Sequence, residues 1–347
     1  MNIYTEEGWL DISMIDAYMD VHNIDQCFIV GARGTGKSYG IQKEILIKGN
    51  KFIYARMSAG EIKMISNPEM NPFNAFYDDP DLKEKIFSVK PIPKVENALY
   101  LLEGENYIGL CLPLVTFGKY RGMDFHEYKT IFLDEFIPER TIKKTAGTGQ
   151  ALKQAYETVN RNRELKGEKP VRLFAAANSL DMNNEILLEF GLIPMMEKCL
   201  KSDKEYWTEG NKILIYPRYS PISAAKAETS LYKGNTGKFG QMALMNEFSD
   251  YGKSNIGSRA IKGIKQKIFL AGNFSVYRLD NGEWYFTRCT HIGHKEGFTQ
   301  VYQDTDYDKR LMLRKFCFLV ETYYHGKVIF ETPEYELLFL KHFKVKL

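Results

Sequence analysis

The sequence predicts an α/β fold with a parallel central sheet, followed by a smaller α+β domain. Three observations support this prediction. Short apolar strands alternate with helical stretches in roughly the first 200 residues of the 347-residue chain. A glycine-rich loop joins the first strand to the first long helix. From about Ile268 the pattern becomes rich in strands, with a strong hairpin signal at Asp280-Asn281-Gly282.

The central sheet is predicted from four apolar segments: Gln26–Val30, Phe52–Arg56, Thr130–Leu133 and Val171–Ala177. Two helices are expected beside them, Lys37–Lys48 with Gly49 as C-cap, and Ala151–Arg163. Between the second and third strands lie three short segments that predict antiparallel strands: Ile86–Lys90, Ala98–Leu102 and Tyr107–Leu112. We interpret this insert as an elaboration on the sheet.

The composition of the chain changes after about residue 200. Residues 201–258 contain Pro217, Pro221 and a loose glycine-rich run, which indicates a linker or small connecting subdomain. The predicted domains are therefore 1–200, 201–258 and 259–347. In the last of these, strands are expected at Phe269–Leu279, Glu283–Arg288, Phe316–Tyr323 and Lys327–Glu331, with a closing helix at Glu334–Phe343.

Composition restricts the class of protein. Hydrophobic residues make up 44% and aromatic residues 14% of the chain, which excludes a disordered protein. No segment resembles a signal peptide or approaches the roughly eighteen apolar residues of a membrane span, so we expect a soluble intracellular protein with no membrane partner. The five scattered cysteines include no Cys-x-x-Cys pair, which favours reduced thiols.

The loop between the first strand and the first helix fits the pattern G-x-x-x-x-G-K-[ST]. Its residues are Gly31, Ala32, Arg33, Gly34, Thr35, Gly36, Lys37 and Ser38, and Tyr39 follows them. Glycines let the backbone wrap phosphate groups, and the helix N-terminus adds partial positive charge. Lys37 would reach the β- and γ-phosphates, and the Ser38 hydroxyl would bind Mg²⁺. The alternative is a simple glycine turn before a helix. The pattern favours ATP and Mg²⁺ as ligands.

A second motif ends the strand at Thr130–Leu133, where two carboxylates follow each other. In a parallel sheet this strand end opens beside the phosphate loop. Asp134 would complete the Mg²⁺ shell, and Glu135 would act as general base on a water molecule. A solvated turn after a strand is the alternative. Adjacent Asp and Glu favour hydrolysis over phosphoryl transfer to a second substrate.

Other polar residues extend this candidate site. Asn178 follows an apolar strand and would hold the attacking water or sense the γ-phosphate, with a helix N-cap as an equal alternative. An arginine from a neighbouring subunit would neutralise transition-state charge. Arg161 is the first candidate, Arg163 the second and Arg140 a further one, each against the alternative of a surface arginine. Arg33 would act in cis or pair with a carboxylate.

Charge is distributed unevenly along the chain. The net charge is +3, but from Tyr251 onward there are 16 Lys and Arg against 10 Asp and Glu, a local balance of +6. The candidate DNA contacts are Lys143 and Lys144 in a loop after the carboxylates, and Arg259, Lys262, Lys265 and Lys267. Solvated basic surfaces are the alternative. Cys289, His291 and His294 do not predict a zinc site, because no second Cys/His pair lies at ligand spacing.

These residues resemble the DNA-packaging ATPases of phi29-type tailed phages, relatives of the large terminases. The resemblance rests on Gly31–Tyr39, Lys119–Met123, Phe132–Phe136 and Thr158–Arg163, together with the overall length. It implies a P-loop ATPase domain of the additional-strand (ASCE) type and an RNase H-like C-terminal domain. It also implies a homo-oligomeric ring, expected to be pentameric, at the prohead portal vertex in the infected bacterial cytoplasm.

One departure from this family concerns nuclease activity, which needs clustered acidic residues to bind two metal ions. Asn273 stands where an acid is expected, and the hairpin offers only Asp280. We therefore expect a vestigial nuclease domain that binds nucleic acid or the portal.

The favoured interpretation is an ATP-hydrolysing motor that translocates double-stranded DNA, with an RNA or protein adaptor to the portal left open. The alternatives are another P-loop enzyme, either helicase-like or a nucleotide kinase, and a nucleotide-gated assembly module without motor activity.

Overall fold

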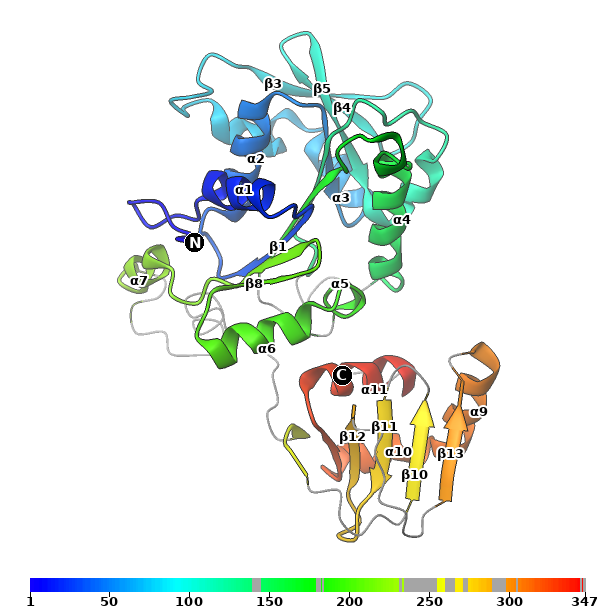
Figure 1. Cartoon of the computed structure of the whole chain (residues 1–347). Coiled ribbons are helices and arrows are strands. Elements are labelled where there is room, and N and C mark those ends of the chain that lie inside the picture. Colours follow the sequence, from blue (N-terminus) through cyan, green and yellow to red (C-terminus); the bar gives the residue numbers. More distant parts are fainter. Residues whose placement is uncertain are drawn as a thin grey trace. The chain divides into compact units, whose positions relative to one another are not determined.

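The structure of the chain is a computed structural model that describes residues 1–138, 145–178, 182, 184–230, 233, 255–259, 266–270, 274–288, 298–303, 305–343 and 345. The chain divides into two compact units, Met1–Asp250 and Tyr251–Leu347 (Figure 1). Within the described residues, no helix combines the length and the apolar character that crossing a membrane requires.

The first unit is built on a nine-stranded sheet with the order β3-β4-β5-β2-β6-β7-β1-β9-β8. Its centre is formed by β1 (Gln26–Gly31), β2 (Phe52–Arg56), β6 (Thr130–Asp134) and β7 (Arg172–Asn178). These strands pair in parallel, so the prediction of a parallel central sheet is confirmed. The carboxyl ends of these strands lie at the same end of the sheet, where Gly31 pairs in register with Asn178.

The insert between β2 and β6 continues this sheet. It contains β3 (Phe87–Pro91), β4 (Leu99–Glu103) and β5 (Asn106–Pro113), which pair with one another in antiparallel fashion, as predicted. However, β5 also pairs in parallel with β2. Gly109 permits this approach, because a Cβ there would lie 2.7 Å from the carbonyl oxygen of Phe52. The insert is thus part of the main sheet.

The far edge of the sheet comes from a segment in which the sequence indicated a linker. Strand β9 (Lys212–Ile215) pairs in parallel with β1, and β8 (Tyr206–Glu209) pairs antiparallel with β9. The short helix α7 (Pro221–Ala227) also lies in the first unit. The expected boundary at residue 200 is therefore corrected: Ile213–Ile215 are fully buried beside β1, and this packing extends the first unit.

Helices cover both faces of the sheet. One face carries α1 (Ile12–Val21), α2 (Lys37–Lys48), α3 (Ala59–Ile65) and the 3₁₀ turns η1 (Pro68–Met70) and η2 (Pro72–Phe76). The other carries η3 (Leu114–Tyr120), α4 (Thr148–Asn160), η4 (Glu164–Lys166), α5 (Glu185–Glu189) and α6 (Leu192–Ser202) (Figure 1). Strand β1 contributes to both cores, because Cys27 and Ile29 pack toward α1 and α2 while Phe28 packs against Phe136 and Phe190.

The second unit contains a five-stranded sheet with the order β13-β10-β11-β12-β14. Its strands are β10 (Gln266–Leu270), β11 (Phe274–Arg278), β12 (Trp284–Thr287), β13 (Phe298–Tyr302) and β14 (Val328–Phe330). The predicted hairpin is confirmed between β11 and β12, with Gly282 in the left-handed region at φ +84°. A single strand was expected at Phe269–Leu279, but this segment contributes to two antiparallel strands, β10 and β11.

The prediction of a strand at Phe316–Tyr323 is wrong, because this segment belongs to α9 (Asp306–Phe316) and α10 (Phe318–Tyr324). Thr305 caps α9 by accepting a hydrogen bond from the Asp308 amide, and the first turn is acidic while the last is basic. These end signals lie outside the apolar run that suggested a strand. The predicted closing helix is confirmed as α11 (Pro333–Phe343).

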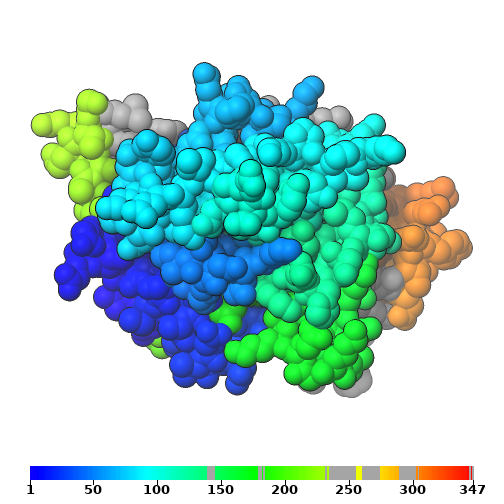
Figure 2. Space-filling model, turned by 90° about the horizontal axis from the view of Figure 1, so that it is seen from above, coloured from blue at the N-terminus to red at the C-terminus, as the bar shows by residue number. Residues whose placement is uncertain are grey.

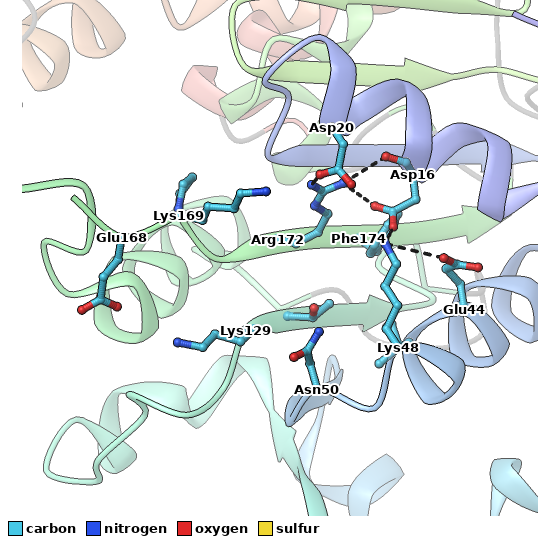
Figure 3. A pocket seen from close by; sticks show the side chains of 13 residues that line it. Asp16, Asp20, Glu44, Lys48, Asn50, Lys129, Glu168, Lys169, Arg172 and Phe174 are labelled. Atoms are coloured by element: carbon cyan, nitrogen blue, oxygen red, sulfur yellow. Dashed lines mark hydrogen bonds and ion pairs between the residues drawn. The ribbon is translucent and has the colours of Figure 1, made fainter. Parts of the chain in front are cut away.

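A cluster of ion pairs at the opposite, amino-terminal edge of the first sheet ties α1, α2 and β7 together (Figure 3). Asp16 is 2% exposed and pairs with both Arg172 and Lys48, while Arg172 also donates to Asp20 at 2.5 Å. These side chains line a cavity of about 470 Å³. A buried carboxylate that holds two cations fixes the helices against the sheet.

We predict that Asp16→Asn lowers the free energy of unfolding by about 3 kcal/mol, because it removes the buried negative charge that pairs with the partly exposed Arg172 and Lys48. Asp20→Asn is the matched control. Its side chain is 50% exposed, so a loss below about 1 kcal/mol is expected. Urea unfolding of both variants measures the difference, and equal losses would contradict the structural role of Asp16.

Candidate phosphate-binding site

The loop between β1 and α2 has a backbone that requires glycine at two positions. Gly34 and Gly36 adopt φ values of +63° and +88°, in the left-handed region that side chains disfavour. Gly36 is the N-cap of α2 and offers no side chain to bind the first N–H groups of that helix. These N–H groups can therefore donate to an anion.

Lys37, the first residue of α2, is folded back over the loop. It is 6% exposed, and its Nζ donates to the carbonyl oxygens of Ala32 (2.5 Å) and Gly31 (3.3 Å) and to Oδ1 of Asn178 (3.1 Å). Burial lowers the pKa of Lys37 to about 7, although the nearby Asp134 carboxylate acts in the opposite direction. An anionic ligand would stabilise the charged form of this buried amine.

Asp134 ends β6 as a buried carboxylate with three donors. Its Oδ1 accepts from the Ser38 hydroxyl at 2.6 Å, and its Oδ2 accepts from the Tyr54 hydroxyl at 2.9 Å and from Nη1 of Arg56 at 3.2 Å. Hydroxyl and carboxylate oxygens are the kind of donors that Mg²⁺ prefers. The residues present therefore fit a magnesium ion held by Ser38 and Asp134.

Glu135 follows in an unusual backbone conformation, with φ +54°. Its half-exposed carboxylate accepts from Nη2 of Arg56 at 2.5 Å. The same nitrogen donates to Glu61 at 3.1 Å, and Glu61 belongs to the capping box of α3. Burial alone would lower the pKa of Arg56, but Tyr54, Asp134 and Glu135 together raise it above its usual value. Arg56 is thus a permanent cation between three carboxylates.

The sequence prediction missed both Tyr54 and Arg56. The sequence did contain a signal for Arg56, because this residue ends the predicted strand Phe52–Arg56. In the structure that strand, β2, pairs with β6, which ends at Asp134. Asn178 was found by that same argument, and it ends β7 with its side-chain oxygen on Lys37.

The structure brings most of the predicted site residues into one cavity of about 350 Å³. It is lined by Arg33, Gly34, Gly36, Lys37, Ser38, Tyr39, Asp134, Glu135, Ala176, Ala177 and Asn178. Tyr39 is anchored outside the loop, because its hydroxyl bonds Asp79 and its ring stacks on Phe76. The backbone of Arg33 accepts a hydrogen bond from Lys226 at 2.7 Å.

The two described candidate arginines lie beyond the end of α4, which stops at Asn160 and not at Arg163 as predicted. Arg161 is the C-cap with φ +38°, and its guanidinium donates to the carbonyl oxygens of Arg121 (2.7 Å) and Met123 (2.9 Å). Arg163 is 3% exposed and donates to the carbonyl oxygens of Phe125, His126 and Tyr128. Both arginines brace the segment 121–128.

The candidate DNA contacts are only partly described. Arg259 forms an ion pair with Glu283 at 2.9 Å, and Lys267 lies in β10. Outside the described residues lie Arg140, Lys143, Lys144, Lys262, Lys265, Asn273 and the segment 289–294.

The sequence matches a known protein family. Residues 16–273 match the model of the podovirus DNA encapsidation protein (Gp16) family. The DNA packaging protein of Bacillus phage B103 is 27% identical over 227 residues, which cover 64% of this chain and 63% of that protein. The match therefore spans less than two thirds of the length of this curated relative.

Two solved structures share the fold. One, "The bacteriophage Phi-29 viral genome packaging motor assembly", has a TM-score of 0.62 at 21% identity and covers 99% of both chains. The other, "The Phi-28 gp11 DNA packaging Motor", has a TM-score of 0.62 at 14% identity and covers 99% of this chain and 100% of its own. At these identities the likeness concerns fold alone.

We predict that Arg163→Ala lowers the free energy of unfolding by roughly 2–4 kcal/mol, because it leaves three carbonyl oxygens without their charged donor. Arg161→Ala removes an exposed guanidinium with two such bonds and should cost less than half as much. Thermal unfolding of both variants measures this difference. A mild Arg163→Ala would show that its side chain is not a structural brace.

Proposed function

The chain belongs to the podovirus DNA encapsidation protein family, and we propose that it is an ATP-hydrolysing motor subunit that moves double-stranded DNA into a viral prohead. The resemblance inferred from the sequence agrees with this family. The observation that carries the enzymatic part is the hydrogen bond between Ser38 and Asp134, which joins the phosphate loop to the carboxylates that follow β6.

In this proposal the loop and Lys37 bind the phosphates of ATP. Lys37 leaves the carbonyl oxygens of Gly31 and Ala32 and places its charge on the β- and γ-phosphates. Ser38 and Asp134 would hold Mg²⁺, which neutralises phosphate charge when it is bound. The N–H groups at the start of α2 complete the cradle.

Glu135 is the proposed general base, and Asn178 orients the attacking water beside it. Before nucleotide binds, Arg56 holds the Glu135 carboxylate. A carboxylate that is held by a guanidinium must be released before it can contact the attacking water, so hydrolysis requires this contact to loosen. Arg56 therefore keeps Glu135 in place until the site is filled.

The remaining assignments are proposals that the resemblance and the sequence support. We propose a homo-oligomeric ring, expected to be pentameric, docked on the portal, with Arg161 acting on the neighbouring site if it releases the 121–128 segment. Arg163 is the weaker candidate because it is buried. The second unit is proposed to be a vestigial RNase H-like domain that binds DNA or the portal through its basic residues, without nuclease activity.

We predict that Glu135→Gln preserves ATP binding but lowers hydrolysis at least about 100-fold, because the general base is lost. Phosphate release and ATP affinity are measured on the same preparation. Glu127→Gln, an exposed glutamate paired with Lys51, is the control and should hydrolyse ATP normally. Unchanged hydrolysis in Glu135→Gln would contradict the assignment, and phosphate transfer only to an added acceptor would favour a kinase.

We also predict that ATP binding takes up a proton at pH 8. The pKa of Lys37 is about 7 in the free protein, so the amine is mostly neutral there, and bound phosphates raise this pKa again. Affinity should therefore fall as pH rises from 7.5 to 9. Calorimetry in buffers of different ionisation enthalpy measures the uptake. Lys37→Arg stays charged and should show none; equal uptake in this variant would contradict the prediction.

A further inference from the structure

The two oxygens of the Asp134 carboxylate have different partners. Oδ1 accepts from the Ser38 hydroxyl at 2.6 Å, on the side of the phosphate loop. Oδ2 accepts from the Tyr54 hydroxyl at 2.9 Å and from Nη1 of Arg56 at 3.2 Å. Because Oδ2 is engaged by donors of β2, the carboxylate turns its other oxygen toward the loop.

Both donors to Oδ2 come from one face of β2. This strand pairs in parallel with β6, and Tyr54 stands in register with Phe132, two residues before Asp134. Side chains two residues apart along a strand share a face, so Tyr54 and Arg56 lie on the face that carries Asp134. The register of two central strands therefore delivers the phenol hydroxyl to the carboxylate.

The two donors differ in what else they bind. The Arg56 guanidinium is shared, because its Nη2 also donates to Glu135 at 2.5 Å and to Glu61 at 3.1 Å. In the proposed cycle the contact with Glu135 loosens, so Arg56 changes its partners. A phenol hydroxyl carries a single proton, and that of Tyr54 is on Asp134. Tyr54 is therefore the donor that can hold Oδ2 throughout the cycle.

The Tyr54 ring is held in place by aromatic neighbours. It is 1% exposed and meets Phe73 and Phe132 edge to face, with ring centroids 5.5 and 5.6 Å apart. Phe73 belongs to η2, in the insert between β2 and β6. Figure 2 shows this insert as the blue to turquoise surface of the first unit. Removal of the hydroxyl alone would leave this packing in place.

We propose that Tyr54 is a positioning residue that fixes which oxygen of Asp134 faces the metal ion, and that it thereby favours Mg²⁺ over Ca²⁺. This inference rests on the proposed function, in which Ser38 and Asp134 hold Mg²⁺. Mg²⁺ requires a nearly ideal octahedral set of ligands, whereas Ca²⁺ accepts one or both oxygens of a carboxylate in a flexible geometry. A carboxylate held through its second oxygen suits the smaller ion.

The test measures binding of the β,γ-imido analogue of ATP by calorimetry in EDTA, in Mg²⁺ and in Ca²⁺. Tyr54→Phe should reduce the gain in affinity from Mg²⁺ about tenfold or more, because partners that orient a metal ligand contribute this much to metal affinity. The gain from Ca²⁺ should fall less, and affinity in EDTA should stay unchanged, which shows that the variant is folded.

Tyr156→Phe is the matched control. Its hydroxyl donates to the Val171 carbonyl at 2.8 Å, away from the carboxylates, so the variant loses a similar hydrogen bond and should bind as the wild type does in all three solutions. The wild type itself should gain more affinity from Mg²⁺ than from Ca²⁺, and the reverse order would overturn the proposed ion preference.

Two results with Tyr54→Phe would overturn the positioning role. One is an unchanged gain from Mg²⁺. The other is an equal loss in EDTA, Mg²⁺ and Ca²⁺, which would mean that the hydroxyl only stabilises the fold. If the wild type gains no affinity from Mg²⁺, the proposed metal site fails and the role of Tyr54 fails with it. That failure appears in the wild type and the others in the variant, so they are distinguishable.

Discussion

The candidate site depends on one buried carboxylate. Asp134 accepts hydrogen bonds from Ser38 of α2 and from Tyr54 and Arg56 of β2, so it joins the phosphate loop, two neighbouring strands and, through Arg56, the general-base candidate Glu135. A buried charge must stay paired, because an unpaired one costs several kcal/mol. A ligand that displaces one donor therefore changes the balance among the others. A ligand bound at the loop can therefore change the contact between Arg56 and Glu135.

The phosphate loop is also enclosed by segments far from it in sequence. Leu10 bonds Thr35, Lys226 bonds Arg33, and a Cβ on Gly31 would lie 2.8 Å from Cγ of Pro217. The N-terminal segment and the chain after β9 thus meet on the loop. Because Lys226 belongs to α7, the loop is in direct contact with that helix.

Much of the site could be predicted because it depends on local spacing and on strand ends. The loop motif identified Lys37 and Ser38, and the strand-end rule identified Asp134 and Asn178. Arg56 ends β2 in the same way, but its role depends on Asp134 and Glu135, which are distant from it in sequence. The burial of Arg163 could not be predicted, since it depends on the carbonyl oxygens of a distant loop. Strand β9 is only four residues long, and its pairing with β1 is a tertiary effect.

The most direct measurement is the rate of Mg²⁺-dependent phosphate release from ATP by the full chain, with and without double-stranded DNA. We expect measurable turnover that double-stranded DNA increases, and loss of that turnover in Asp134→Ala, which removes the carboxylate on which the network depends. Turnover that persists in Asp134→Ala would contradict the assigned site. Turnover that is indifferent to DNA would contradict the motor function while leaving the nucleotide site intact.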